Sequence, residues 1–460
     1  MTPPPTDINQ EEILENIRYL LENDQPEYVL NILADLHPAD ISDLLEHLDS
    51  DDRLQVFERL SQQIASDVLS ELEDATKEDV LEELDPTTIA ELVNEMDSDD
   101  AADLVQEVRE LSEDKASEVL AQVEDEASEE IQELLEYPED SAGGIMAKEY
   151  VAVNADWSVE RTIEEIRKNR EEVEEIYQCY VIDSDAKLVG IVPLKELVLA
   201  KPGAKIKTIM DDDVFPVTSE MDQEEVARMF EKYDLVSAPV INEQGQLIGR
   251  ITVDDIVDVI TEEAEEDISR IAGIGEEEVL EDSVYRIVRA RLPWLVISFF
   301  GQILSAFIMK YFEASLAEIL VSAFFIPLVM AMGGSIGQQT GIIVVRGLAT
   351  GEINPKDLRR RLLRETKAAV VNAIVIAVLT FLAVLVMIQS INFGLVLAFA
   401  LVIVVLNASI FGAMIPFGFK KLSLDPAIAS GPFVTTFNDV VGLIIYLLLL
   451  QVTLSQGIIG

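Results

Sequence analysis

The sequence predicts a multidomain membrane protein in which an all-α acidic helical repeat and an α/β tandem precede a five-helix α transmembrane bundle. The chain has 460 residues and a formal charge of −53, yet its mean hydropathy is positive at +0.23. The charge is divided unevenly, because residues 1–285 carry 20 basic and 79 acidic side chains while residues 286–460 carry 13 and 7. One part of the chain therefore suits water and the other suits lipid.

The N-terminal part is expected to be a helical-repeat domain over residues 1–136. Leu, Ile and Val recur every three to four positions among Asp and Glu, which is helical spacing. The stretch LHPADISDLLEHLDSDD at residues 36–52 returns as LDPTTIAELVNEMDSDD at residues 84–100, 48 positions later, with a weaker copy from Leu60. Each unit reads as a helix pair that buries its apolar face against its neighbours.

A second repeat follows Gly143 and Gly144, which break the helical spacing. Each copy reads as strand, helix, strand, turn, strand and helix, so two βαββα units are predicted at residues 137–205 and 206–262. The matching segments are VAVNADWSVERTIEEIRK (151–168) with FPVTSEMDQEEVARMFEK (215–232), and YVIDSDAKLVGIVPLKEL (180–197) with PVINEQGQLIGRITVDDI (239–256).

An acidic helix is expected to continue out of the second unit over residues 254–282, within a connecting segment at residues 263–288. Two carboxylates ~6 Å apart at an effective dielectric of about 20 repel by roughly 3 kcal/mol, so a compact group of them needs counterions. Mg²⁺ meets this need, because it prefers oxygen ligands and holds one or two carboxylates while keeping waters. The alternative is a long solvated helix without a specific ion.

Residues 289–460 form the predicted transmembrane domain. Five apolar segments of membrane length lie there, at residues 292–309, 319–345, 368–388, 393–419 and 428–452. Basic residues cluster before the first segment, between the second and third, and between the fourth and fifth, whereas only Lys310 lies on the other side. The positive-inside rule places the N-terminal domains in the cytoplasm and the tail, residues 454–460, outside a cell membrane.

Asp439 is an acidic residue inside the last of these segments, GPFVTTFNDVVGLIIYLLLLQV at residues 431–452. A charge at the centre of a membrane helix costs at least ~2.5–3.5 kcal/mol, so such residues usually face an interior, a cavity or an ion path. Gly431, Thr435 and Asp439 follow at i, i+4 and i+8, which gives the helix one small polar stripe. The alternative is that Asp439 only bonds a neighbouring helix.

Composition and motifs argue against several other functions. The acidic soluble part disfavours nucleic acid and anionic lipid as partners and favours divalent cations. Cys179 is the single cysteine, so an intrachain disulfide is excluded. The Gly-Lys-Ser/Thr phosphate loop is absent, and His37 and His47 are expected to cap helices or face solvent. We therefore predict no catalytic activity.

The order of these regions resembles the MgtE magnesium transporters over nearly the whole chain, and the paired βαββα units resemble cystathionine-β-synthase (CBS) domains. Besides Asp439, the likeness rests on DSAGGIM (140–146), ITVDDIVDVI (251–260), PLVMAMGG (327–334), VVRGLATGEI (344–353) and LDPAIASGPFVTT (424–436). The resemblance implies a homodimeric Mg²⁺ channel in the cell membrane, whose pore follows the dimer axis between the second and fifth helices.

Within that resemblance, Asp439 of each subunit would hold a largely hydrated Mg²⁺ in the pore. Gly333, Gly334, Thr435 and Thr436 would line the same path. One departure is the stretch SIGQQ at residues 335–339, where the family usually has an Asn-rich turn. The choice among Mg²⁺, Mn²⁺ and Co²⁺ is therefore left open.

The resemblance also implies that intracellular Mg²⁺ closes the channel by bridging the soluble domains. The matching candidates are Asp99, Asp103, Asp254, Glu262, Glu265 and Glu266. From the residues alone, the aspartates of the helical repeat, which also include Asp97 and Asp100, serve equally well as helix caps and solvated faces.

CBS pairs commonly bind adenine nucleotides such as ATP through a Gly, Ser/Thr and Asp pattern. The second unit has this pattern as Gly249, Thr252 and Asp255, whereas the first has Pro193 and Glu196 instead. The alternative is ordinary strand-turn-helix chemistry. A second function also stays open, namely a membrane-tethered divalent-ion or nucleotide sensor that regulates a partner without conducting ions.

Overall fold

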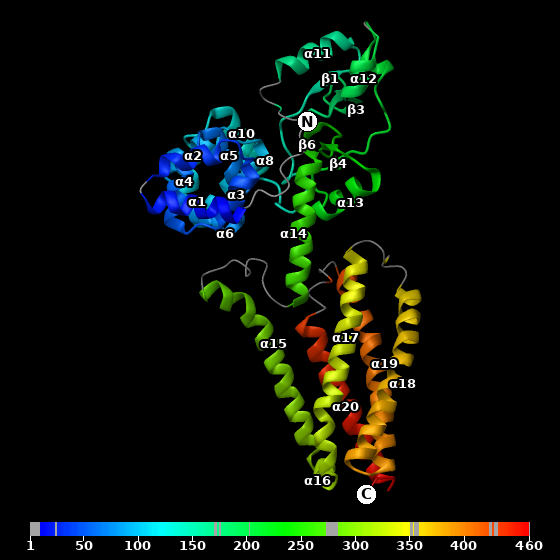
Figure 1. The fold of residues 1–460 in the computed structure, drawn as a ribbon. Helices are drawn as coiled ribbons and strands as arrows, with labels where there is room; N and C mark the ends of the chain where they lie inside the picture. The colour runs from blue at the N-terminus through cyan, green and yellow to red at the C-terminus, as the bar shows by residue number, and fades with distance from the viewer. Residues whose placement is uncertain are drawn as a thin grey trace. The chain divides into compact units, whose positions relative to one another are not determined.

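The chain forms two compact units, Met1–Glu262 and Glu263–Gly460. Figure 1 shows them in a computed structural model that describes residues 10–23, 25–169, 173, 176–201, 203–272, 284–349, 353, 358–422, 426 and 431–459. Parts of the predicted connecting segment and of the motifs at residues 344–353 and 424–436 lie outside the described residues. The fold class is the predicted one: a helical N-terminal region, two α/β units and a bundle of long helices.

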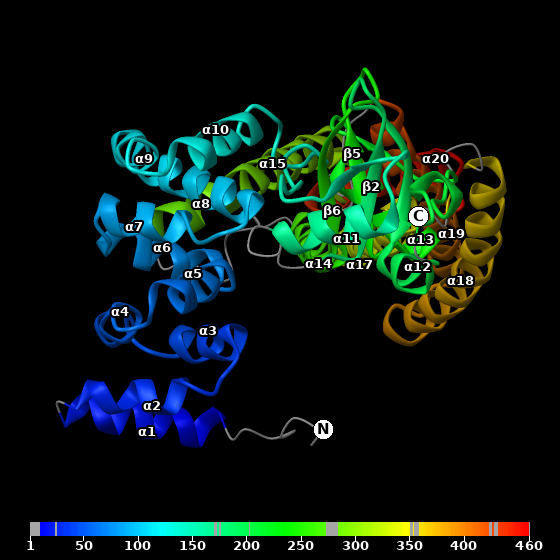
Figure 2. The same cartoon turned by 90° about the horizontal axis from the view of Figure 1, so that it is seen from above.

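The N-terminal region is a row of short helices, which Figure 2 shows in chain order from α1 to α10. They are α1 (Gln10–Glu22), α2 (Val29–Leu33), α3 (Pro38–Glu46), α4 (Ser50–Phe57), α5 (Gln62–Ser70), α6 (Asp74–Glu83), α7 (Pro86–Val93), α8 (Ser98–Leu111), α9 (Glu113–Leu120) and α10 (Asp125–Leu134), with the 3₁₀ helix η1 at Pro26–Tyr28. Helices α3, α5 and α7 begin at Pro38, Gln62 and Pro86, so the repeat is 24 residues long. The predicted spacing of 48 spans two such units.

Polar residues before the helices set where they start. Asp49 accepts a hydrogen bond from the amide of Asp52 at 3.0 Å, and Asp85 accepts one from Thr87 at 2.9 Å. Nδ1 of His37 accepts a bond from the amide of Ala39 at 3.3 Å, which confirms His37 as a cap. These side chains satisfy helix N–H groups that have no partner within the helix.

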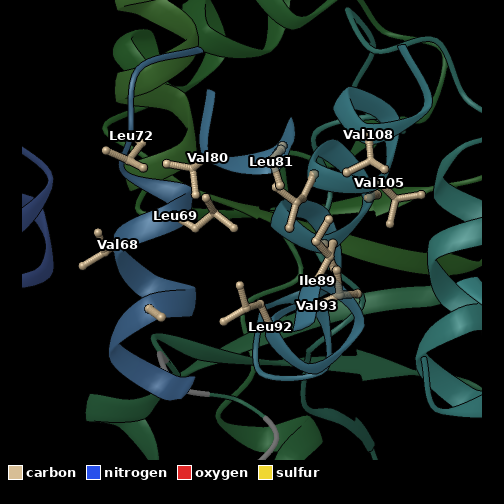
Figure 3. Packing of buried hydrophobic residues seen from close by; sticks show 14 of the residues in the cluster. Val68, Leu69, Leu72, Val80, Leu81, Ile89, Leu92, Val93, Val105 and Val108 are labelled. Atoms are coloured by element: carbon tan, nitrogen blue, oxygen red, sulfur yellow. The ribbon is translucent and has the colours of Figure 1, made fainter. Parts of the chain in front are cut away.

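The core of the repeat is a continuous row of aliphatic side chains between consecutive helices. Figure 3 shows Leu69, Leu81, Ile89, Val93 and Val105 from successive helices meeting there. All five are at most 1% exposed, and burying each contributes about 1.5–3 kcal/mol. The same core continues into the second α/β unit, so the helical repeat and that unit form one hydrophobic interior.

The two α/β units repeat one topology, as predicted. The first contains β1 (Ala152–Asn154), α11 (Val159–Lys168), β2 (Gln178–Ile182), β3 (Leu188–Pro193) and α12 (Leu194–Leu199); the second contains β4 (Val217–Thr218), α13 (Gln223–Tyr233), β5 (Ser237–Ile241), β6 (Leu247–Thr252) and α14 (Val253–Ala272), and the 3₁₀ helix η2 (Ile206–Thr208) lies between them. In each sheet the first strand is parallel to the second, and the third is antiparallel to it. Helix α14 is unbroken across residue 262, the predicted end of the second unit.

The DSAGGIM segment pairs with the second α/β unit, although the predicted range assigns it to the first. The amide of Ala142 donates to Met221 O at 2.7 Å, and Ala147 and Arg250 exchange backbone bonds of 2.8 and 2.9 Å. A β-carbon on Gly249 would lie 2.6 Å from Met146 Sδ. Glycine is therefore needed at position 249 to admit this segment.

The second compact unit, Glu263–Gly460, is a helical bundle. Its elements are α15 (Val284–Tyr311), α16 (Glu313–Glu318), the 3₁₀ helix η4 (Leu320–Phe325), α17 (Ile326–Ala349), α18 (Leu358–Met387), α19 (Ile391–Lys421) and α20 (Pro432–Ser455). Five of these helices are long and apolar enough to cross a membrane, as predicted. Helix α19 lies at the centre, since half of its apolar stretch is buried, whereas only 6% of that in α15 is. Figure 1 shows α15 diverging from the other helices toward its N-terminal end.

Candidate functional site

Asp439 lies on α20 at its contact with α17. A β-carbon on Gly334 of α17 would lie 2.9 Å from Asp439 Oδ1 and 3.1 Å from Thr435 Cγ2. The glycine therefore leaves the space that the carboxylate occupies. Helix α17 stays regular through Gly333 and Gly334, and the carboxylate remains half-buried in an otherwise apolar bundle.

Asn438 is a functional candidate that the sequence reasoning missed. Its side chain is 2% exposed, and Nδ2 donates to Val434 O at 2.9 Å. Its Oδ1 has no hydrogen-bond partner among the described residues. A β-carbon on Gly337 would collide with this amide, and one on Gly333 would lie 3.3 Å from Asn438 O. The sequence could have pointed to Asn438, because it is a second polar residue next to Asp439 in an otherwise apolar segment.

The four residues predicted to line the pore fall on two contacts of α20. Gly333, Gly334 and Thr435 lie where α20 meets α17. Thr436 instead faces α15, where a β-carbon on Gly301 would overlap its methyl group. The structure thus gathers three of the four around Asp439 on the α17 side, and their lining of a pore stays a prediction.

In the first compact unit, Met1–Glu262, acidic residues lie together at the N-terminal turn of α8 in the helical repeat. Asp97 precedes the helix, Asp99 and Asp100 lie in its first turn, and Asp103 follows one turn later. Ser98 donates to Glu149 through its amide at 3.1 Å and through its hydroxyl at 2.9 Å. Glu149 therefore holds the segment before β1 against this helix end and adds a further carboxylate.

Asp255 of α14 faces the same turn and is the strongest charged neighbour of both Asp99 and Asp100. Burial raises the pKa of Asp99 well above its ordinary value, and repulsion by Asp255, Asp100, Asp97 and Glu149 raises it further. Burial followed by repulsion from Asp255 raises the pKa of Asp100 to about 6. We term the set Asp99, Asp100, Asp103 and Asp255 the acidic cluster.

Asp103 extends the cluster along α8. Burial, and then repulsion by Asp100 and Glu107, raises the pKa of Asp103 to about 7. Asp100 and Asp103 are nevertheless exposed to solvent, so water screens these charges and weakens the desolvation that raises their pKa values. Two cations act on the cluster: Arg250 on Asp255, and Lys77 on Asp100 and Asp103, but Lys77 also forms a 3.1 Å ion pair with Glu107.

The donor chemistry of the cluster suits Mg²⁺, because every side chain offers hard carboxylate oxygen. No group of three or more His, Cys, Asp or Glu side chains converges as a preformed metal site within the described ranges. A cation bound at the cluster would therefore keep much of its water shell. This matches the reluctance of Mg²⁺ to lose water.

The remaining regulatory candidates all lie on α14. Asp254 repels Asp258 one turn further on, and this repulsion adds to burial in raising the pKa of Asp258. Glu266 pairs with Arg270, while Glu262 and Glu265 are exposed. Asp255, next to Asp254, is the residue whose charge acts most strongly on Asp99 and Asp100. The predicted roles of these four residues stay predictions.

Thr252 and Asp255, the nucleotide-binding candidates, form the cap of α14. Asp255 Oδ2 accepts bonds from the Thr252 amide at 3.1 Å and from its hydroxyl at 2.8 Å. Tyr180 Oη and Ser237 Oγ lie 2.6 Å apart and link the two α/β units. The cap is the structural alternative to nucleotide binding, and the same carboxylate acts on Asp99 and Asp100.

Comparisons with known proteins match all three regions. The family model of the MgtE intracellular N domain covers residues 36–140, that of the CBS domain covers 142–203 and 206–262, and that of the MgtE divalent cation transporters covers 326–449. Among solved structures, the cytosolic domain of the Mg²⁺ channel MgtE in complex with ATP is 33% identical, with a TM-score of 0.51 over 54% of this chain and 99% of that one. The soluble part of a magnesium transporter is 30% identical, with a TM-score of 0.50 over 56% of this chain and 100% of that one.

Curated relatives agree with these matches. The magnesium transporter MgtE of Bacillus subtilis is 34% identical over 305 residues, which are 66% of this chain and 68% of the relative. That of Thermus thermophilus is 33% identical over 313 residues, with the same coverage of 66% and 68%. Family models, relatives and fold coincide, and the chain belongs to the MgtE family of magnesium transporters.

Proposed function

We propose that the protein is a Mg²⁺ channel that admits Mg²⁺ to the cell and closes when intracellular Mg²⁺ binds its soluble domains. The observation that carries the conducting role is the half-buried Asp439 carboxylate, held against Gly334 inside an apolar bundle. A lone acid in such surroundings is costly and attracts a cation. The membrane potential supplies the driving force, about 2.3 kcal/mol per charge per 100 mV.

The acidic cluster supports the closing role. Its carboxylates raise one another's pKa values, so the contact between α8 and α14 is opposed by repulsion until a cation neutralises it. A ligand shifts an equilibrium only through its different affinity for the two states. Mg²⁺ bridging α8 and α14 binds the compact state better, and several weak ions together supply the ~5.5 kcal/mol that a full switch needs.

Three further features belong to the proposal. The channel acts as a homodimer that presents Asp439 twice. Its soluble domains are cytoplasmic and its C-terminus lies outside, in keeping with the basic flanks of the membrane helices. ATP binds the paired CBS units, in keeping with the solved relative in complex with ATP.

The test of conduction is Mg²⁺ uptake into liposomes that contain the full-length protein. Asp439→Asn keeps the shape of the side chain and removes its charge, so uptake should fall at least roughly tenfold. Glu318→Gln, which neutralises an exposed carboxylate at the end of α16, is the matched control and should conduct normally.

The outcome separates the two candidate functions. Unchanged uptake in Asp439→Asn, with normal folding by size-exclusion chromatography, would overturn the conducting role. A protein that binds Mg²⁺ but never carries it would instead be a tethered sensor. Recording single-channel currents while internal Mg²⁺ is raised tests closure, because open probability should fall as the cluster is filled.

A further inference from the structure

Helix α15 contacts the rest of the bundle through a narrow seam. Most of its large apolar residues are exposed, including Leu295, Phe299 and Phe307 at 60% or more. Ser305, by contrast, is 1% exposed, and a side chain on Gly301 would overlap Thr436 of α20. Small residues thus let α15 approach α20 closely at this one level.

The close approach brings a polar side chain of α15 to the ion-binding carboxylate. Gln302 follows Gly301, and its Nε2 donates a hydrogen bond of 3.4 Å to Asp439 Oδ2. The other oxygen, Oδ1, is the one beside Gly334 of α17. The two oxygens of Asp439 are therefore oriented by two different helices.

Resting on the proposed function, we infer that Gln302 is a positioning residue that orients the Asp439 carboxylate toward a hydrated cation. A primary amide suits this task, because it donates a hydrogen bond without cancelling the charge that attracts the ion. A Lys or Arg at the same place would neutralise Asp439. At 3.4 Å the bond is long, so it orients the carboxylate without holding it rigidly.

The first experiment separates positioning from packing. Initial Mg²⁺ uptake is measured against external Mg²⁺ in liposomes of the full-length protein, without internal Mg²⁺. Gln302→Leu should raise the half-saturating Mg²⁺ concentration roughly three- to tenfold, the size expected for the loss of one hydrogen bond of ordinary strength, with little change in maximal uptake. Ser305→Ala, which changes the same seam without touching Asp439, should leave the half-saturating concentration as in the unaltered protein.

An exchange of the two groups gives the sharper test. The double variant Gln302→Glu/Asp439→Asn returns a carboxylate and an amide to the pair in reversed positions. It should regain several-fold of the uptake lost in Asp439→Asn alone, whereas Gln302→Glu alone places two acids together and should raise proton sensitivity of uptake between pH 6 and 8.

The outcomes distinguish this inference from the proposed function. Lost uptake in Asp439→Asn with no recovery in the double variant, and an unchanged half-saturating concentration in Gln302→Leu, would overturn the role of Gln302 alone. Undiminished uptake in Asp439→Asn would overturn the pore role and this inference with it. Elution volume and unfolding midpoint in detergent show whether each variant is folded. If Gln302→Leu does not fold, Gln302→Asn is used in its place, because its shorter amide also removes the hydrogen bond to Asp439.

Discussion

The acidic cluster of the first unit and Asp439 of the second place carboxylates under opposite conditions. In the cluster, Asp99, Asp100 and Asp255 repel one another, and the nearby Lys77 is already paired with Glu107. Asp439 stands beside a glycine and a neutral amide. The stability of the acidic cluster therefore depends on its total charge and on the cations that neutralise it. The position of the Asp439 carboxylate depends instead on the packing around it.

The largest effect should come from filling the space beside Asp439. Gly334→Val places atoms where Asp439 Oδ1 and Thr435 Cγ2 lie, at a cost of about 1–3 kcal/mol for overpacking. We expect uptake to fall at least roughly tenfold, with Mg²⁺ binding by the soluble domains unaffected. Gly418→Val is the control, because no atom lies within 4 Å of a β-carbon there. Equal uptake in both variants would refute the dependence on packing.

Neutralising the acidic cluster should stabilise the protein, whereas filling the space beside Asp439 should impair it. Asp99→Asn/Asp100→Asn relieves repulsion but keeps the shape of the two side chains. Without Mg²⁺, the free energy of unfolding should therefore increase by about 1 kcal/mol, after screening of the charges by water, and the unfolding midpoint should rise. The rise caused by added Mg²⁺ should shrink in the same variant. Asp114→Asn, in the first turn of α9, serves as control. A lower midpoint without Mg²⁺ would contradict the repulsion.

The cluster should also make stability depend on pH. A carboxyl whose pKa is raised by folding stabilises the folded state below its unfolded value of 3.8, and this contribution is lost as pH rises through about 6 for Asp100 and about 7 for Asp103. With a chelator present, the unfolding midpoint should therefore fall between about pH 4 and 7, and the fall should be smaller in Asp99→Asn/Asp100→Asn. A midpoint that rises equally in both proteins would exclude this titration.

The smallest change in the response to Mg²⁺ is expected at Ser98, whose hydroxyl bonds Glu149 and the amide of Lys148 beside the cluster. Ser98→Ala removes the hydroxyl that donates to Glu149, and stability should fall by about 0.5–1.5 kcal/mol. Mg²⁺ should still raise the unfolding midpoint by the usual amount, because no cluster carboxylate is altered. Thermal unfolding with and without Mg²⁺ measures both quantities. A lost response to Mg²⁺ would mean that Ser98 and Glu149 belong to the cation site itself.

Much of the fold could be predicted, because apolar runs and helical spacing are properties of the sequence itself. The sequence showed the repeat most clearly at a spacing of 48 and only weakly from Leu60, since the intermediate unit has Glu73 and Asp74 where its neighbours have Asp-Ser-Asp-Asp. The five candidate membrane helices were found because no other helix among the described residues is apolar over such a length.

The sites could be predicted only in part. The sequence pointed to Asp99 and Asp439, but neighbouring positions on a helix differ by about 100° in direction, so only packing decides that Asp255 faces α8. Gln302 and Asn438 are visible as polar residues in apolar helices. The partner of Gln302 is Asp439 on another helix, and the packing of Asn438 against Gly337 also joins two helices, so a single sequence contains neither pairing.

The glycines between α17, α19 and α20 have a mechanical consequence. A β-carbon on Gly412 of α19 would strike the carbonyl of Gly337, so these backbones are in contact, and a relative slide would separate surfaces that fit closely. Helix α15 has no such interlock along most of its length. Helix α15 is the least buried of the five candidate membrane helices, so the packing of the bundle restrains it least, whereas the helices that surround Asp439 on the α17 side are closely interlocked.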